Sequence, residues 1–279
     1  MANAADLLVK PRHVILHDES TGTGLHTSEI ADYIVSLLPG LKVTFRSSLL
    51  ESNLGELSPE EREDTVSRVA QGFARLKIRN PSTKEQNFSV LSGEVGYEQR
   101  RLSSRGSTYG LIYRGEGAQR LMQELLPSRE RNLSFLHIVF TNQFFGTWGE
   151  DGRYHLRVAV YGAPNLISTT GLVEALSKPR EFYLLKQHYA GLGMSDALTG
   201  WEKQLGERVL RHGDSRLTEV MKGYVMQALF YHVTGDPFCS DKSCRLHNAH
   251  WHEEAIAAQM GGAYEFCPRH EAILAQLDP

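Results

Sequence analysis

The sequence predicts an α/β fold, in which helices pack against a mixed sheet, and two patterns predict it. Near the N-terminal end, an apolar run at residues 13–17 precedes a helical pattern and the alternating segment 41–46. A strand, a helix and a strand in this order favour a parallel pair. Further along, residues 133–141 are apolar on both faces, which is typical of a central, covered strand.

Capping residues mark the helices of the first half. Ser28 suits the N-cap of a helix that Pro39-Gly40 ends. Ser58-Pro59-Glu60-Glu61 predicts a second helix, because it places a capping serine, a first-turn proline and two acids at the positive end of the dipole. The Gly-, Ser- and Arg-rich region 93–117 indicates a hairpin or an exposed excursion, and residues 115–126 indicate a helix.

The second half alternates between short strands and helices. Residues 155–161 alternate as a half-exposed strand does, and the preceding linker 146–152 could turn a hairpin. Residues 165–170 indicate another extended segment. Helical patterns follow at 171–175, at 179–189, and from Ser215 to a stop at Gly235. Residues 249–260 and 271–277 predict the last two helices.

Composition excludes several classes of protein. The chain has 279 residues, of which 41% are apolar and 23% charged, as in ordinary globular domains. A formal charge of -3 gives no strong field for nucleic acid or an acidic membrane. We see no signal peptide in residues 1–12 and no apolar run near the roughly 18 residues of a membrane span. Three cysteines suit thiolate ligands in a reducing cytoplasm better than a disulfide framework. No glycine-rich phosphate motif points to an organic cofactor.

The cysteines form two pairs of potential metal ligands. Cys239-x4-Cys244 is followed, after a long insert, by Cys267-x2-His270. Zinc prefers four tetrahedral sulfur and nitrogen donors, and such short pairs supply two donors each. We therefore predict a structural Cys3His zinc site. Two alternatives stay open: either His247 or His250 replaces His270 as the fourth ligand, or the three thiols are simply buried.

The segment that leads into the first cysteine resembles the zinc helix of archaemetzincins. That family carries His-Glu-x-x-His-x-x-Gly-x-x-His-Cys, then x4-Cys and a later Cys-x2-Cys. Here Gly235 and the three cysteines fall in register, and His270 stands for the last cysteine. The chain is also similar, over most of its length, to an uncharacterised archaemetzincin-like group of bacterial metallopeptidase homologues. Four stretches carry that likeness: 153–155, 167–174, 178–181 and 244–251. It implies a zincin-like region at 131–279 and an N-terminal β-α-β region at 1–130, which could form one continuous domain.

The departures from the family pattern concern the catalytic ligands. Ala228 stands at the first histidine, Leu229 at the general base and Phe238 at the third ligand, so only His232 remains. A hydrolytic zinc needs several protein ligands, and the attacking water needs a base. The resemblance therefore implies that the structural zinc is kept while the hydrolytic zinc is lost.

Other side chains could rebuild a site. On a predicted helix, His250 would share one face with Glu254 and with His247, which would permit a second metal. Glu174, Arg180 and Glu181 could orient a substrate or act as acid and base, or could be a capping ion pair. Arg153, His155 and Arg157 alternate along one strand face, as an anion-binding strip or a solvated edge would.

Three functional hypotheses follow. The first is a pseudoenzyme that binds a peptide or small molecule in the former peptidase cleft. The second is an enzyme with different chemistry there, using some of Glu174, Arg180, Glu181, His155 and His232. The third is a peptidase whose metal site is remodelled around His232 and His250. The sequence does not indicate the oligomeric state.

Overall fold

A five-stranded sheet forms the centre of the protein. The computed structural model describes residues 9–20, 22, 24–84, 89–104, 110–192 and 205–277. The strand order is β2-β1-β4-β8-β7. The first four strands are parallel, and only β7 runs against its neighbour β8. The bounds are β1 His13–Glu19, β2 Lys42–Arg46, β4 Phe135–Thr141, β7 Ala159–Val160 and β8 Asn165–Ser168.

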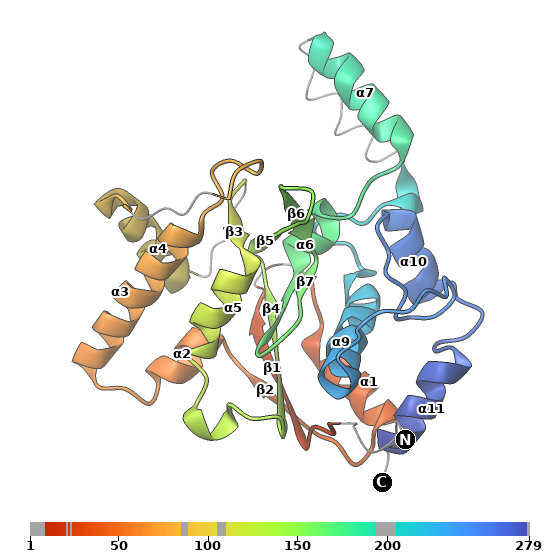
Figure 1. The fold of residues 1–279 in the computed structure, drawn as a ribbon, viewed down its shortest axis with the longest axis horizontal. Coiled ribbons are helices and arrows are strands. Elements are labelled where there is room, and N and C mark those ends of the chain that lie inside the picture. Colours follow the sequence, from red (N-terminus) through yellow and green to blue (C-terminus); the bar gives the residue numbers. More distant parts are fainter. Residues whose placement is uncertain are drawn as a thin grey trace.

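Helices cover both faces of this sheet (Figure 1). One face packs on α1 (Thr27–Leu37) and α9 (Leu217–Thr234) through a core that contains Leu136 and Ile138 of β4. The other face packs on α2 (Leu49–Leu54), α3 (Pro59–Leu76) and α5 (Gly115–Gln123) through a core that contains Val139. Alternate residues of β4 thus enter different cores, which confirms the prediction of a central strand covered on both sides. The mixed α/β class is confirmed as well.

Local signals predicted several boundaries, although Ser28, expected as an N-cap, lies inside α1, whose N-cap is His26. The parallel pairing of β1 with β2 confirms the β-α-β unit at the N-terminal end. Ser58 and Glu61 form the reciprocal capping box of α3, with Pro59 in its first turn. Gly235 ends α9 in the left-handed conformation, at φ 78°, which glycine adopts without strain.

A second sheet of three strands has the order β3-β5-β6. Its members are β3 (Ile112–Arg114), β5 (Phe144–Trp148) and β6 (Tyr154–Arg157). The antiparallel pair β5–β6 turns near the predicted linker, but its first strand is β5 and not the expected run 133–141, which lies in the other sheet. The expected single strand at 155–161 is wrong, because β6 and β7 belong to different sheets. The chain passes from one sheet to the other at residues 157–159, between β6 and β7. Gly171 packs against this point, because any larger side chain there would clash with the carbonyl oxygen of Arg157.

Of the hairpin or exposed excursion expected at 93–117, the hairpin is wrong for residues 93–104, which belong to α4 (Ser92–Ser104). The buried carboxylate of Glu98 anchors this helix: it lies 2.9 Å from Lys77 Nζ and 2.6 Å from Arg101 Nε, and it accepts a hydrogen bond from the hydroxyl of Tyr113. Lys77 and Tyr113 lie outside α4, and Arg101 reaches Glu98 only once the helix has formed. The local composition of this segment therefore does not reveal these contacts. Residues 105–109, which belong to the same predicted region, lie outside the described residues.

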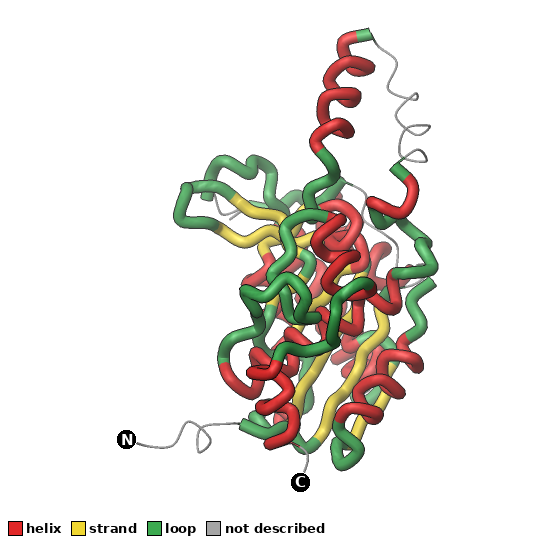
Figure 2. The backbone as a smooth tube through the Cα atoms, turned by 90° about the vertical axis from the view of Figure 1, so that its right-hand side faces the viewer, coloured by secondary structure: helices red, strands yellow, loops and turns green. Residues whose placement is uncertain are grey.

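The C-terminal third contains the remaining helices: α6 Thr169–Glu174, α7 Arg180–Gly191, α10 His252–Met260 and α11 Pro268–Leu277. Helix α7 projects away from the layered body in both views (Figure 1, Figure 2). Both sheets combine strands from either side of residue 130, and the division into two regions there stays a prediction. Among the described residues, no helix is both long and apolar enough to cross a membrane.

Candidate metal centre

The two predicted ligand pairs meet beyond the end of α9. Cys239 follows Gly235, and Cys244 lies in the next turn, where its N–H donates to the carbonyl of Asp241. Cys267 and His270 come from the beginning of α11. The N–H of Cys239 donates to Leu246 O over 2.9 Å, so the first pair is held on a closed loop. All four side chains are buried, and their donor atoms lie within 4.8 Å of one another.

The distances suit one tetrahedral ion. Sγ of Cys239 lies 3.8 Å from Sγ of Cys267, and Nδ1 of His270 lies 3.1 Å from Cys267 Sγ and 3.6 Å from Cys244 Sγ. Two sulfurs bound at about 2.3 Å in a tetrahedron are roughly 3.7 Å apart. The residues present therefore fit a metal ion, which they could hold as three thiolates and one imidazole.

Burial makes these donors unfavourable as ions in the absence of a metal. It raises the pKa of the Cys244 thiol to about 12 and also raises the pKa of Cys239. It lowers the pKa of His270, which keeps that imidazole neutral, as a ligand must be. A bound cation would reverse the preference of the thiols, because a coordinated thiol loses its proton. A bound metal would therefore be needed to keep Cys239 and Cys244 ionised in this buried place.

The expected second metal site on a helix at 247–254 is wrong in its geometry. His250 precedes α10 in extended chain, where its carbonyl accepts from Ser177 N over 2.8 Å. Glu254 instead accepts a hydrogen bond from the backbone N–H of His250 over 3.0 Å, as a capping residue does. Neither His247 nor His250 joins the Cys3His group. All twelve histidines and all three cysteines lie in the described residues, and there this is the only group of three or more potential ligands.

A cleft lies beside the edge strand β7 and the second half of α9. It is open to solvent and is lined by Tyr161, Tyr224, Phe238 and residues 156–159, 175–176 and 248–250. Tyr161 donates from its hydroxyl to Oε1 of Gln227 over 2.5 Å. Its ring also packs against Tyr231 and Phe238, with centroids 6.0 and 5.9 Å away. Tyr224 is thus the α9 residue that lines the cleft, and Gln227 and Tyr231, four residues apart, contact Tyr161 behind it.

The residues that resemble the remnant of a catalytic motif lie elsewhere. Ala228 and Leu229 are buried in the core on α9. His232 forms a hydrogen bond through Nε2 with the carbonyl of Leu133 over 2.9 Å, and burial lowers its pKa. It lines a separate cavity, together with Glu130 and His137. Of the four motif positions, only Phe238 reaches the cleft. Sequence reasoning missed Gln227 and Tyr231, although a glutamine within an apolar helix was a visible signal.

The other candidate groups are not gathered in one place. Glu174 lies 3.5 Å from His212, and a hydrogen bond from that histidine lowers the pKa of the glutamate. Glu181 pairs with Arg208, which also binds Glu253, and Arg180 is exposed at the beginning of α7. His155 and Arg153 both contact Asp151 over 2.7 Å, while Arg157 donates to Thr147. An acidic partner thus lies within the expected anion-binding strip.

Two buried histidines lie between β1 and β4, on the face opposite α9. Nε2 of His17 lies 3.2 Å from Nδ1 of His137. Nε2 of His137 lies 3.7 Å from Oε2 of Glu130, whose carboxylate accepts hydrogen bonds from both Nη groups of Arg46. Burial lowers the pKa of His17 to about 3 and that of His137 to about 4. Both side chains therefore stay neutral in the folded chain at neutral pH.

This pair makes stability depend on pH. The unfolded chain binds protons near pH 6.5 while the folded chain does not, so stability is lost as pH falls from about 6.5 towards 4. At pH 5 the loss is about 2 kcal/mol for each histidine. His17→Phe is expected to make the decrease of unfolding free energy between pH 7 and 5 shallower by roughly one proton. Denaturant titrations would measure this, with the exposed His155→Gln as control, and equal slopes for all three proteins would contradict it.

The comparisons with known proteins place the chain in a family. No curated protein and no solved structure matches it. Residues 10–277 match the model of a family described as "Probable metallopeptidase family (DUF6775)". That match covers both sheets, the metal cluster and the cleft. The chain therefore belongs to this probable metallopeptidase family.

Proposed function

We propose that this chain is an archaemetzincin-like member of its family that keeps a structural zinc and does not hydrolyse peptides. One observation carries the proposal. On α9, Gln227 and Tyr231 lie one helical turn apart, and both contact Tyr161, which lines the cleft. A zincin needs two imidazoles at such positions and a carboxylate beside the first. An amide and a phenol cannot supply that chemistry.

The donor set supports zinc as the ion of the Cys3His cluster. Thiolates with one imidazole in a tetrahedral arrangement suit zinc, and a closed four-ligand shell leaves no position for a water. Such an ion would join the end of α9 to α11 without taking part in a reaction. When bound, the ion would link the segment that follows α9 to the beginning of α11.

The cleft supports binding of an extended peptide or a small molecule. Its walls combine three aromatic rings and several aliphatic side chains with the polar residues Arg157, Asn248 and His250, and ligand sites generally pair an apolar lining with a few polar groups. The strand β7 forms one edge of the five-stranded sheet, and residues 156–161 run along the cleft. An extended peptide can add to such an edge through backbone hydrogen bonds. Phe238, 37% exposed, would then be a contact for an apolar side chain.

The two rival hypotheses have less support. Different chemistry in the cleft would require several of Glu174, Arg180, Glu181, His155 and His232 in one place, whereas the described structure gives them separate partners. A remodelled peptidase would require His232 and His250 around one ion, but they line different cavities.

Metal content and peptide cleavage together test the proposal. The purified protein, equilibrated with excess zinc and desalted, is expected to carry one zinc per chain by elemental mass spectrometry. It should cleave nothing in a mixture of unlabelled peptides analysed by mass spectrometry. Cys267→Ser should lose the zinc, and Gln227→Leu should keep it. Two zinc ions per chain, or cleavage that His232→Gln abolishes while the Cys3His zinc stays bound, would refute the proposal.

A further inference from the structure

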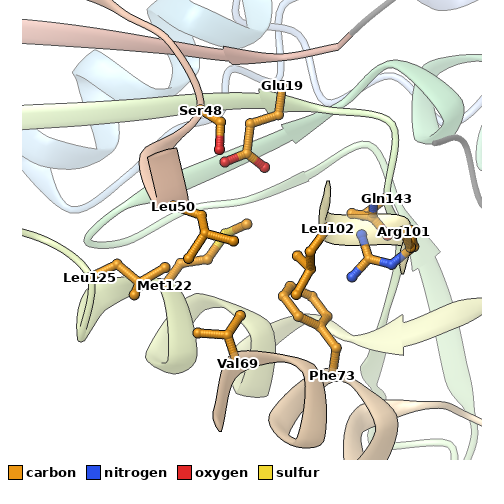
Figure 3. Close-up of a pocket in the computed structure, with 10 residues that line it drawn as sticks. All are labelled: Glu19, Ser48, Leu50, Val69, Phe73, Arg101, Leu102, Met122, Leu125 and Gln143. Carbon is orange, nitrogen blue, oxygen red and sulfur yellow. The ribbon is translucent and has the colours of Figure 1, made fainter. Parts of the chain in front are cut away.

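The small pocket in Figure 3 lies at the carboxyl ends of β1 and β4, and its charged side chains already have partners. Oε1 of Glu19 accepts a hydrogen bond from the backbone N–H of Leu49, and Nε of Arg101 donates to Glu98. This pocket therefore presents charges that are already matched. The thiols of the Cys3His cluster are different, because the thiolate that binds a metal is also the form of cysteine that reacts with oxidants.

Two of these thiols are in contact across the two ligand pairs. Sγ of Cys239, in the segment after α9, lies 3.8 Å from Sγ of Cys267, which directly precedes α11. A disulfide places its sulfurs about 2.05 Å apart, so each sulfur would have to move by only about 1 Å. Small rotations of the two side chains can therefore join them.

Cys244 is less suited to such a bond. It is fully buried, whereas Cys239 and Cys267 are 9% and 8% exposed, so a dissolved oxidant reaches the latter two first. Cys239 and Cys244 also share a tight turn, in which Asp241 donates its N–H to Sγ of Cys239 and accepts at its carbonyl from the N–H of Cys244. A disulfide between those two would have to close within this turn, whereas one between Cys239 and Cys267 joins separate segments.

We propose that a peroxide converts the zinc-loaded cluster into a Cys239–Cys267 disulfide, which releases the ion and loosens one wall of the cleft. This inference rests on the proposed function, since it takes zinc as the resident ion. One thiolate attacks hydrogen peroxide, becomes a sulfenic acid and displaces hydroxide. The other thiolate attacks that sulfur, forms the S–S bond and displaces a second hydroxide. With two protons from solvent, two thiolates and one peroxide give one disulfide and two waters, and two electrons pass from sulfur to peroxide.

Oxidation of this pair removes two of the four metal ligands. Cys244 and His270 remain, and two donors do not make a structural zinc site. The disulfide meanwhile ties α11 to the segment after α9, which is the link that the ion supplied. The oxidised chain therefore loses its ion but keeps this connection, and a thiol reductant can reverse the change.

The backbone of the cluster continues into the wall of the cleft. Phe238, which lines the cleft, directly precedes Cys239. Asn248, which also lines it, donates its N–H to the carbonyl of Cys239 over 3.4 Å, and Cys239 forms an isolated bridge with His247. A shift of Cys239 towards Cys267, without the ion that fixes this loop, therefore strains the hydrogen bonds that hold residues 247–250.

Mass spectrometry of the peroxide-treated, zinc-loaded chain tests this inference. After treatment and blocking of free thiols, we expect one zinc released per chain by a colorimetric chelator, a Cys239–Cys267 disulfide, and Cys244 recovered as a blocked thiol. Dithiothreitol with added zinc should restore the starting form. Exchange of the backbone amides of 247–250 with deuterium should accelerate by at least about tenfold on oxidation. The amides of β1, which is paired on both sides, should exchange as before.

Two matched variants test the choice of partners. Cys244→Ser keeps the contacting pair and should form the same disulfide. Cys239→Ser keeps two thiols as well, but it should form an internal disulfide at least about tenfold more slowly.

Four outcomes for the parent chain would overturn the inference. They are retention of zinc in peroxide, a disulfide that includes Cys244, thiols oxidised to sulfonic acids without a disulfide, and unchanged exchange at 247–250. Failure of the untreated chain to bind zinc, or cleavage of peptides by it, would instead refute the proposed function, so the two fail separately.

Discussion

Replacing Cys267 by serine is expected to abolish metal binding and to destabilise the chain by roughly 4 kcal/mol or more. The reason is that α11 has limited packing of its own, with Ile273 and Leu277 only partly buried against the core. Apart from His270, only Leu274 of this helix is buried. Without an ion, the Cys3His cluster becomes a set of buried polar groups with no strong partner, which is costly. We therefore expect α11 to detach from the end of α9.

Thermal unfolding and limited proteolysis would measure this effect. The variant should unfold at a clearly lower temperature than the parent chain, and its C-terminal segment should be cleaved first. Chelation of the parent chain should give the same pattern. Glu271→Gln is the matched control, because Glu271 lies in the same helical turn but is exposed. A serine variant that retains stoichiometric zinc, or that unfolds together with the control, would contradict the expectation.

Much of the central fold could be predicted because its signals are local. Ser58 with Glu61, and Gly235 at a helix end, specify boundaries through their own backbone chemistry. The apolar residues of β4 specify its central place, because a strand covered on both faces has no polar side. The metal cluster belongs to the same class, since the short spacing of each pair already brings two donors together.

What could not be predicted depends on contacts between distant segments. Helix α9 is buried nearly all around, so its sequence has no polar face to show which side meets the cleft. Only the contacts of Tyr161 reveal that Gln227 and Tyr231 pack against a cleft residue, whereas Ala228 and His232 do not. The capping of α10 by Glu254 likewise depends on the bridge between Ser177 and Trp251, which keeps His250 extended. The two residues of this bridge, Ser177 and Trp251, are 74 positions apart, so no local sequence pattern indicates their contact.

Glu98→Gln is the second substitution with a large expected effect, because it removes the carboxylate that α4 is built around. Glu98 is fully buried, and both Lys77 and Arg101 lie within 2.9 Å of it. Breaking a buried ion pair from one side costs about 3–5 kcal/mol, since the partner charge stays in a medium of low polarity. Here two cations lose the same partner, so we expect a value near the upper end.

The cost should shrink when a cation is removed together with the carboxylate. In a double-mutant cycle, Lys77→Met combined with Glu98→Gln should be less destabilising than the sum of the two single changes, because the charge that raised the cost is gone. Denaturant unfolding would supply the free energies, and Glu124→Gln, whose partner Arg68 is exposed like itself, should cost no more than about 1 kcal/mol. Additivity in the cycle would mean that Glu98 acts through packing alone.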